Sequence, residues 1–312
     1  MPFDLGYPPS RFVSSRPGYN GTSLQDVAKR FGSEDECFEH VWAQRSDAGS
    51  ICTNCGKLGR WYRRRGAKHF QHSCGATISP LRGTLLHATK LPLRLWFYAL
   101  LHFANSSEGV NAAFLGRQLG ITYPAAFRMA YKIRLHLAAL EALAEPISEG
   151  RDVHARLVTL HRARSGSQRP NTLNVLFVAS DTRVDCAVLA APRRHSVRAA
   201  IEKLMPGHGQ VITTCYRTSQ VLSAYKTRQP LATFVPTFFL DHPTERDLIS
   251  GFLSYFLQPF KNHHKHASRE YFWLYLKDFQ FRYNRRDRSG DTYWDMVRSF
   301  PQLELQALQR RP

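Results

Sequence analysis

Three cysteines stand at a spacing that suits a metal ion. Cys52 and Cys55 form a Cys-x-x-Cys pair, and Cys74 follows further along the chain. Such a pair places two thiolates on one tight turn, where Gly56 supplies a permissive backbone. Zinc in structural sites takes four cysteine or histidine ligands in a tetrahedron. The spacing therefore predicts part of a zinc ribbon.

The fourth ligand stays open at this level. A complete ribbon has a second Cys-x-x-Cys pair, but the position that would pair with Cys74 holds Gln71. His72 and His69 both lie close by, and neutral imidazole is an ordinary zinc ligand. We favour His72, keep His69 as an alternative, and treat a ribbon that has lost its metal as the competing hypothesis. A bound zinc would be structural, because four protein ligands leave no open position for chemistry.

Positive charge dominates the composition and is concentrated next to these ligands. The chain has 43 Lys and Arg against 24 Asp and Glu, a net charge of +19, and no carboxylate occurs between Asp47 and Glu108. A polyanion relieves the repulsion within such a surface, so nucleic acid is the first candidate partner. An anionic membrane surface or simple solubility is the alternative. The candidate phosphate contacts in the ribbon are Arg60, Arg63, Arg64, Arg65 and Lys68.

A helix-turn-helix pattern follows, over residues 112–138. Apolar residues recur at helical spacing on both sides of Gly120, which suits a turn that requires a positive φ. In such motifs the second helix enters the major groove of DNA. A plain packing hairpin has the same pattern and is the alternative. The side chains of the second helix expected to face a groove or phosphates are Tyr123, Arg128, Tyr131, Lys132 and Arg134.

Stepwise changes in composition divide the chain around these residues. We expect an extended lead-in, N-terminal helices, a zinc-ribbon-like lobe, a helical DNA-binding region, a second domain and a C-terminal tail. Their predicted bounds are, in that order, 1–22, 23–48, 49–84, 90–145, 150–288 and 289–312. Ser23 and Ser33 are the expected N-caps of the two N-terminal helices.

The segment 150–288 alternates strand-like and helical patterns in the order β-β-β-α-β-α-β-α-α. This order predicts a mixed sheet covered by helices. The fold class expected for the whole chain is therefore multi-domain α+β or α/β. Helical and zinc-ribbon parts and a helix-turn-helix would precede the sheet domain.

Other protein classes fit the sequence poorly. No stretch approaches the roughly 18 consecutive apolar residues of a transmembrane helix, and the first residues lack the apolar core of a secretory signal. The six cysteines do not have the spacing of a disulfide scaffold. We expect a protein of the reducing cytoplasm, associated with the nucleoid and without a membrane partner.

Several strings, in one order, resemble a known family. They are FGSEDECFEHVWAQR, CTNC, ISPLRGTLLHATKLPLRLWFYALLHF and LGRQLGITYPAAFRMAYKIR, then PGHGQVITTCYRTSQVLSAY and the ending FRYNRR. These strings are similar to bacterial zinc-ribbon DDE insertion-sequence transposases, the group related to the eukaryotic Merlin transposases. The resemblance covers roughly residues 28–286. It implies an RNase H-like catalytic domain behind a front that binds double-stranded DNA.

The resemblance also implies three carboxylates that hold two magnesium ions, and other residues stand at those positions. Where the family has Thr-Asp-Gly, this chain has Thr214 at the acid position, and Ser250 stands where the family has Glu before Gly-Phe. The first matching strand carries Arg156 and no internal acid. Hydroxyl groups bring no charge to offset divalent cations. Asp152 and Asp247 are the residual acids near these positions.

We therefore expect a transposase-derived, sequence-specific DNA-binding protein without nuclease chemistry, in an accessory or regulatory role. It would act as a homodimer or within a larger nucleoprotein assembly, with zinc as its cofactor and no magnesium at a catalytic site. One alternative is an active magnesium-dependent transposase that cuts and joins inverted-repeat ends with relocated acids. Another is a basic adaptor in a nucleoprotein or RNA complex. The remaining predicted DNA contacts are Lys261, Lys265, Arg285 and Arg286.

Overall fold

The computed structural model forms two compact units, unit 1 (Met1–Ala142 and Asp287–Pro312) and unit 2 (Leu143–Arg286). None of the described helices is both long and apolar enough to cross a membrane. The residues that the structure describes are 22–44, 51–52, 54–58, 61–64, 66–106, 108–144, 150–162, 171–180, 183–207, 209–213, 216–222, 233–234, 248–264, 267–268, 270–286, 292–304 and 306.

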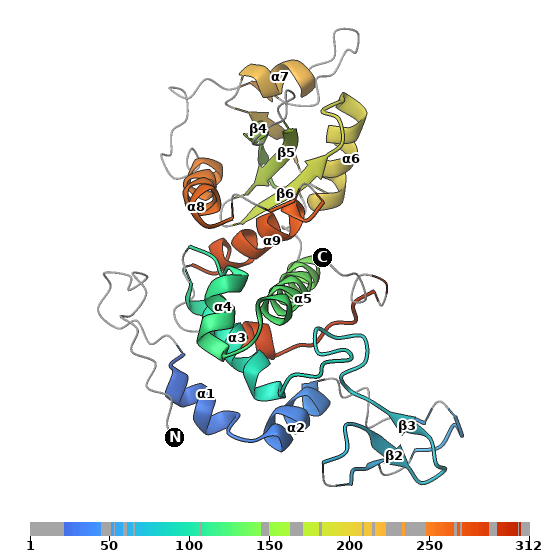
Figure 1. Cartoon of the computed structure of the whole chain (residues 1–312). Coiled ribbons are helices and arrows are strands. Elements are labelled where there is room, and N and C mark those ends of the chain that lie inside the picture. The colour runs from blue at the N-terminus through green and yellow to red at the C-terminus, as the bar shows by residue number, and fades with distance from the viewer. Residues whose placement is uncertain are drawn as a thin grey trace. The chain divides into compact units, whose positions relative to one another are not determined.

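Unit 1 is mainly helical (Figure 1). Ser23 and Ser33 cap its first two helices: each hydroxyl oxygen accepts the N–H of the acidic residue three positions later, whose carboxylate accepts the N–H of the serine. Both predicted N-caps are confirmed, since each satisfies a backbone N–H that has no partner inside the helix. The helices of unit 1 are α1 (Leu24–Arg30), α2 (Glu34–Gln44), α3 (Leu93–Asn105), α4 (Ala112–Leu119), α5 (Tyr123–Ala142) and α10 (Thr292–Val297).

Helix α10 belongs to the core of unit 1. It packs against α3, and both Met296 and Val297 are buried. Nε2 of His136 lies 2.7 Å from the carbonyl oxygen of Met296, and Nε2 of His40 lies 2.8 Å from that of Val297. The sequence predicts a C-terminal tail over 289–312, and within this segment α10 is part of the core of unit 1. Packing between segments this far apart in the chain leaves no local pattern in the sequence.

A small antiparallel sheet forms the ribbon lobe of unit 1. Its strands, in the order β1-β2-β3, are β1 (Trp61–Tyr62), β2 (Phe70–His72) and β3 (Thr77–Ile78). Strands of two or three residues bury little apolar surface of their own. Phe70 stacks on Trp42 with ring centroids 3.7 Å apart, and on Phe38 of α2 at 5.6 Å. The ribbon therefore shares its core with α2, which carries both Trp42 and Phe38.

Unit 2 contains a five-stranded mixed sheet in the order β6-β5-β4-β7-β8. The pairs β4–β5 and β5–β6 are antiparallel, whereas β4–β7 and β7–β8 are parallel. The elements follow one another in the expected order, and the mixed α and β class is observed. They are β4 (Val153–Arg162), β5 (Asn171–Ala179), β6 (Val184–Leu189), α6 (Arg194–Leu204), β7 (Val211–Thr213), α7 (Tyr216–Leu222), β8 (Thr233–Phe234), α8 (Leu248–His263) and α9 (Phe272–Tyr283).

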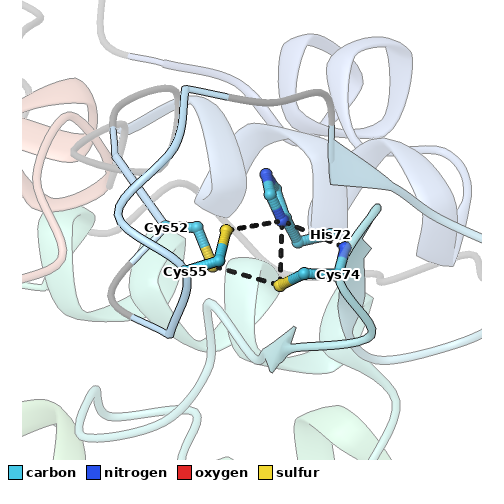
Figure 2. A group of neighbouring side chains, drawn as sticks. All are labelled: Cys52, Cys55, His72 and Cys74. Atoms are coloured by element: carbon cyan, nitrogen blue, oxygen red, sulfur yellow. Dashed lines mark hydrogen bonds between the residues drawn. The ribbon is translucent and has the colours of Figure 1, made fainter.

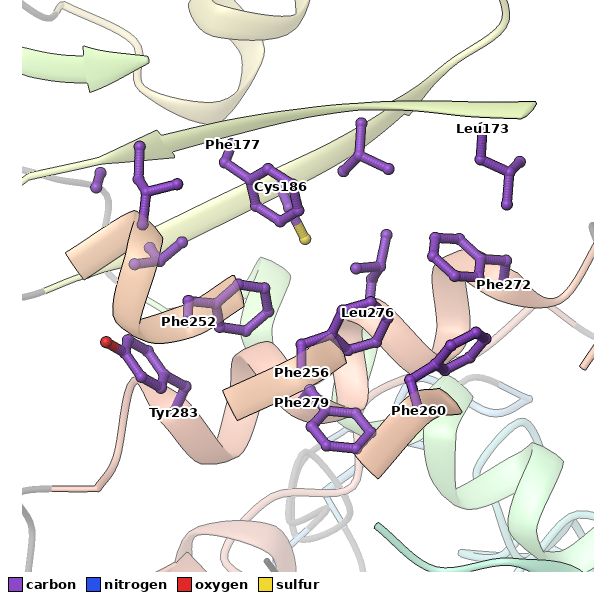
Figure 3. Packing of buried hydrophobic residues seen from close by; sticks show 14 of the residues in the cluster. Leu173, Phe177, Cys186, Phe252, Phe256, Phe260, Phe272, Leu276, Phe279 and Tyr283 are labelled. Atoms are coloured by element: carbon purple, nitrogen blue, oxygen red, sulfur yellow. The ribbon is translucent and has the colours of Figure 1, made fainter. Parts of the chain in front are cut away.

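Helices cover both faces of this sheet. On one face, Phe177 and Cys186 pack against Phe252 and Phe256 of α8 and against Phe279 of α9 (Figure 3). On the other face, a second apolar cluster joins β4 and β5 to α6 and α7. The alternation of side chains along each strand fixes which residues enter which cluster. Polar side chains of the strands can therefore be assigned to a face by their register.

We predict that unit 1 loses stability in mild acid through His136. Burial lowers the pKa of His136 from 6.5 to about 4, and its ring is fully buried. Between these values the unfolded chain binds a proton that the folded chain does not, so the free energy of unfolding falls as pH decreases, by up to about 3 kcal/mol. Urea unfolding of the wild type and of His136→Gln, followed by tryptophan fluorescence at pH 7 and pH 4.5, measures this contribution.

The matched control is His195→Gln, because His195 is exposed on α6. We expect the difference in unfolding free energy between the two pH values to be smaller in His136→Gln and unchanged in His195→Gln. Equal pH dependence in all three proteins would show that His136 is not the buried neutral base described above.

Candidate metal centre and nucleic-acid surface

The first two cysteines lie on a tight turn at the start of the ribbon. An isolated β-bridge between Ile51 and Leu58 closes the turn. Within it the backbone N–H of Cys52 donates to the carbonyl of Lys57 at 3.0 Å, and the N–H of Gly56 donates to the carbonyl of Cys52 at 2.8 Å. Gly56 has a φ of +66°, a conformation that disfavours side chains with a Cβ atom. The permissive role predicted for this glycine is confirmed.

The other two candidate ligands lie on a second turn, at the end of β2. The N–H of His72 donates to the carbonyl of Ala76 at 2.8 Å, and the N–H of Gly75 donates to the carbonyl of His72 at 2.9 Å. Gly75 also has a positive φ, +87°. Cys74 sits at the tip of this turn, and its own N–H donates to Nδ1 of His72 at 3.3 Å. Two similar turns therefore face each other.

Four ligand atoms converge between the turns (Figure 2). The Sγ atoms of Cys52, Cys55 and Cys74 and a ring nitrogen of His72 all lie within 4.8 Å of one another. Sγ of Cys52 is 3.7 Å from Sγ of Cys74, and Sγ of Cys55 is 3.7 Å from Nδ1 of His72. Tetrahedral zinc with Zn–S bonds of about 2.3 Å separates its ligand atoms by about 3.8 Å. The side chains present thus fit a tetrahedral zinc ion.

The chemistry of the group agrees with its geometry. Hydrogen bonding from the backbone at Ala76 and from His72 lowers the pKa of the Cys74 thiol to about 6. The thiolate is the form that binds metals. The His72 ring is buried, and its centroid lies 5.0 Å from that of Trp61, whereas His69 is exposed. The structure therefore brings His72, and not His69, to the three thiols.

Acidic residues of α2 neutralise one of the predicted DNA contacts. The guanidinium of Arg63 donates to Asp35 at 2.6 Å and to Glu39 at 2.8 Å, and it lies 4.1 Å above the ring of Phe38. Arg63 therefore joins the ribbon to α2, and its charge is already compensated. Sequence reasoning missed this because the two acids precede the basic stretch. Arg64 and Lys68 are exposed, while Arg60 and Arg65 lie outside the described residues.

The helix-turn-helix pattern corresponds to α4 and α5. Asn111 caps α4, its Oδ1 accepting the N–H of Phe114 at 2.8 Å. Gly120 ends α4 in the left-handed conformation with a φ of +62°, as the sequence predicted. The N–H of Ile121 then donates to the carbonyl of Gly116 at 3.1 Å, which ties the turn to the first helix. Helix α5 begins directly afterwards, at Tyr123.

Only the first turns of α5 present predicted contacts to solvent. Tyr123 and Arg128 are exposed. Tyr131 and Arg134 are buried, and Arg134 donates to the carbonyl of Val110 and lies 5.4 Å from the ring centroid of Phe103. The expectation that these two side chains face a groove is corrected, because α5 continues into the core of unit 1. Residues 133–137 are all buried, which shows where α5 enters this core.

Lys132 on α5 is half-buried, between the exposed Arg128 and the buried Arg134. Its Nζ donates to the carbonyl of His87 at 2.6 Å and lies 5.9 Å from the ring centroid of Trp96. Burial and the nearby charge of Arg128 lower the pKa of Lys132. Lys132 makes no ion pair within the described part of the chain, so its charge remains uncompensated beside Arg128.

Two of the four predicted contacts at the C-terminal side of unit 2 interact with the end of α9. Arg285 donates to the carbonyl of Phe281 at 3.0 Å, and its guanidinium lies 3.6 Å from that ring. Arg286 donates to the carbonyl of Tyr283 at 2.9 Å and lies 4.1 Å from its ring. Cationic side chains at a helix C-terminus satisfy its last carbonyls. Lys261 lies within α8, and Lys265 is outside the described residues.

The positions matched to catalytic acids hold no carboxylate group where they are described. Nη1 of Arg156 on β4 donates to Oγ of Ser250 on α8 at 3.0 Å. Asp152 precedes β4, is exposed, and its Oδ1 accepts the N–H of Gln210 at 2.8 Å. Thr214 and Asp247 lie outside the described residues. The contact between Arg156 and Ser250 had no signal in the sequence, because the two residues are far apart in the chain.

Comparison with known proteins assigns no family to this chain. No protein-family model matches it. No curated protein is significantly similar to it. The geometry of the metal centre, of α5 and of the Arg156–Ser250 contact is therefore what supports a function.

Proposed function

We propose that this chain is a transposase-derived DNA-binding protein whose ribbon and helix-turn-helix contact a duplex. The observation that carries the proposal is the exposed beginning of α5, which presents Tyr123 and Arg128 directly after the left-handed turn at Gly120. In helix-turn-helix proteins the N-terminal residues of the second helix contact base edges. The burial of α5 beyond this point agrees with such a role, because only its first turns would enter a groove.

The uncompensated cations of unit 1 support a phosphate partner. Arg64, Lys68 and Arg128 are exposed and form no ion pair among the described residues. Neutralising phosphates with such side chains releases counterions and favours binding at low salt. Binding as a homodimer or in a larger nucleoprotein assembly, at the nucleoid, is part of the same hypothesis, because inverted-repeat DNA suits two-fold symmetric proteins.

Zinc would serve the ribbon as a structural ion. The described part of the lobe has three short strands, and Phe70, its one large apolar aromatic side chain that is buried, packs on α2. A metal that crosslinks the two turns contributes the folding free energy that so small a core lacks. Its four protein ligands leave the ion no role in catalysis. The ribbon would then hold Arg64 and Lys68 in fixed positions.

We infer that unit 2 is an RNase H-like domain without catalytic magnesium. A mixed sheet with helices on both faces is the arrangement that the transposase resemblance implies. Arg156 on the central strand and Ser250 on α8 are in contact, at places where the resemblance expects a site for magnesium. A guanidinium there would repel divalent cations and could not replace a carboxylate ligand.

The DNA-binding proposal predicts that Arg128→Ala weakens binding and flattens its salt dependence. Each phosphate contact contributes about 0.9 to the slope of log K against log salt. Fluorescence anisotropy with a duplex taken from the genomic ends flanking the gene, at several salt concentrations, measures both quantities. Tyr123→Ala should also weaken binding without changing the slope, because it removes no charge.

The control is Lys29→Ala, which removes another exposed positive charge, from α1. We expect this control to bind like the wild type. Equal losses in Arg128→Ala and Lys29→Ala would mean that net charge alone drives association and that α5 is not the contact surface.

The metal proposal predicts that zinc retention depends on His72. The wild type and His69→Ala should purify with about one zinc ion per chain. His72→Ala should lose zinc to a chelator much faster, because a ligand of the tetrahedron is missing. Atomic emission analysis before and after dialysis against the chelator gives the result. Zinc loss in His69→Ala together with retention in His72→Ala would contradict the assignment of His72.

If the nuclease chemistry is lost, we expect no DNA cleavage above background in the presence of magnesium or manganese. The substrate is plasmid DNA that carries the genomic ends flanking the gene, with nicked and joined products separated on gels. Wild type, Asp152→Ala and Asp247→Ala should behave alike. Metal-dependent products in the wild type that either substitution abolishes would favour the active transposase instead.

A further inference from the structure

Arg156 is a positive charge with too few partners for its surroundings. It lies on β4, the central strand of the sheet in unit 2, and its side chain is half-buried. Its one hydrogen bond to a side chain of the described residues goes to Oγ of Ser250. A guanidinium has five N–H donors and a full charge, whereas the Ser250 hydroxyl carries no charge and accepts only one of these donors here. Partly buried charges are normally paired.

The register of the sheet shows how unusual this position is. Arg156 pairs with Phe177 on β5, and Phe177 pairs with Cys186 on β6. Residues paired in this way share a face, and Phe177 and Cys186 both belong to the apolar cluster beneath α8 and α9 (Figure 3). An apolar side chain would continue this row at no electrostatic cost. Packing therefore gives no reason for an arginine here.

The helix that Arg156 contacts adds to the imbalance. Ser250 lies in the first turn of α8, and this turn contains no acidic residue. A helix N-terminus carries a partial positive charge, so a guanidinium beside it meets a charge of the same sign. Leu248 in the same turn is held in place, since its carbonyl accepts the hydroxyl of Tyr283 at 3.1 Å. An anion next to Arg156 would be stabilised by both the guanidinium and the helix.

The topology of the sheet places Arg156 beside the carboxyl end of one parallel strand, β7. The chain order reverses between β4 and β7: β5 and β6 extend the sheet on one side, and β7 and β8 extend it on the other. The parallel register pairs Val153 with Val211 and His154 with Ile212, so Arg156 lies at the level where β7 ends. Ligands of open sheets bind outside the carboxyl ends of parallel strands at such a reversal.

We propose that Arg156 and Ser250 form a subsite for a phosphate group. The planar guanidinium would bind two phosphate oxygens, and the hydroxyl of Ser250 would donate to a third. The phosphate belongs either to the backbone of bound DNA, in which case the proposal rests on the DNA-binding function, or to a free phosphate ion. Either source supplies the negative charge that the position lacks.

The first experiment measures duplex binding against salt for Arg156→Gln, Ser250→Ala and the control Lys203→Ala. Lys203 is an exposed lysine on α6, which covers the opposite face of the sheet. A phosphodiester contact predicts a slope flatter by about 0.9 in Arg156→Gln. The slope should stay unchanged in Lys203→Ala. Ser250→Ala should lower affinity without changing the slope, because it removes no charge.

The second experiment detects a free phosphate. The thermal unfolding midpoint of each protein is compared in sodium phosphate and sodium chloride at equal ionic strength. A ligand that binds the folded state raises this midpoint. A rise that occurs in the wild type and Lys203→Ala but is absent in Arg156→Gln supports the subsite. It does so even if no duplex binds, an outcome that would reject the DNA-binding function alone.

Two further variants keep the proposal testable. Arg156→Lys retains the positive charge but loses the planar guanidinium that can bind two phosphate oxygens. It should therefore keep the salt slope and bind phosphate more weakly. This variant replaces Arg156→Gln if that protein does not fold. Asp247→Asn removes the acid that precedes α8 and should leave phosphate binding intact. A phosphate effect seen only in Asp247→Asn would identify Asp247 as the partner of Arg156 and overturn the proposal. So would wild-type behaviour of Arg156→Gln or Arg156→Lys in both experiments.

Discussion

Removing a positive charge from water is costly, and this cost distinguishes two groups among the basic residues that the structure describes. Arg63 is paired with Asp35 and Glu39, Arg134 donates to a backbone carbonyl, and Arg282 pairs with the buried Asp278 at 3.0 Å. These side chains hold elements together, because each already has a charged or polar partner within the protein. The exposed cations Arg64, Lys68 and Arg128 keep their charge in solvent, where a polyanion can reach it. The net charge of +19 therefore exceeds the positive charge that is available to bind a polyanion.

The ribbon lobe is stabilised in a different way, because it is too small to have an extensive apolar core of its own. Its strands are too short to bury a core, so its order depends on the stacking of Phe70 with Trp42 and Phe38 and on four ligand atoms that converge between two turns. Glycines with positive φ make both turns tight enough for this convergence. A metal ion at this point would link the two turns directly, and the basic side chains on the ribbon would then have defined positions.

Unit 2 combines a well-packed scaffold with one position that packing does not explain. Apolar clusters fill both faces of its sheet, and polar contacts such as the one from Tyr283 to the carbonyl of Leu248 fix α8 on α9. Arg156 interrupts this pattern at the central strand, next to a helix N-terminus. A scaffold of this kind can hold a charged side chain in an unfavourable place when a ligand supplies the missing charge.

Local patterns let the sequence determine the ribbon cysteines, the N-caps Ser23 and Ser33, the left-handed turn at Gly120 and the order of strands and helices in unit 2. Each of these depends on residues that are neighbours in the chain, or on a turn whose backbone conformation one residue type favours. Only the tertiary structure decided that His72 and not His69 joins the thiols, that Tyr131 and Arg134 are buried, and that α10 enters unit 1. It alone brought Arg156 to Ser250. These outcomes depend on which distant segments exclude water from a side chain, and sequence periodicity carries no information about that.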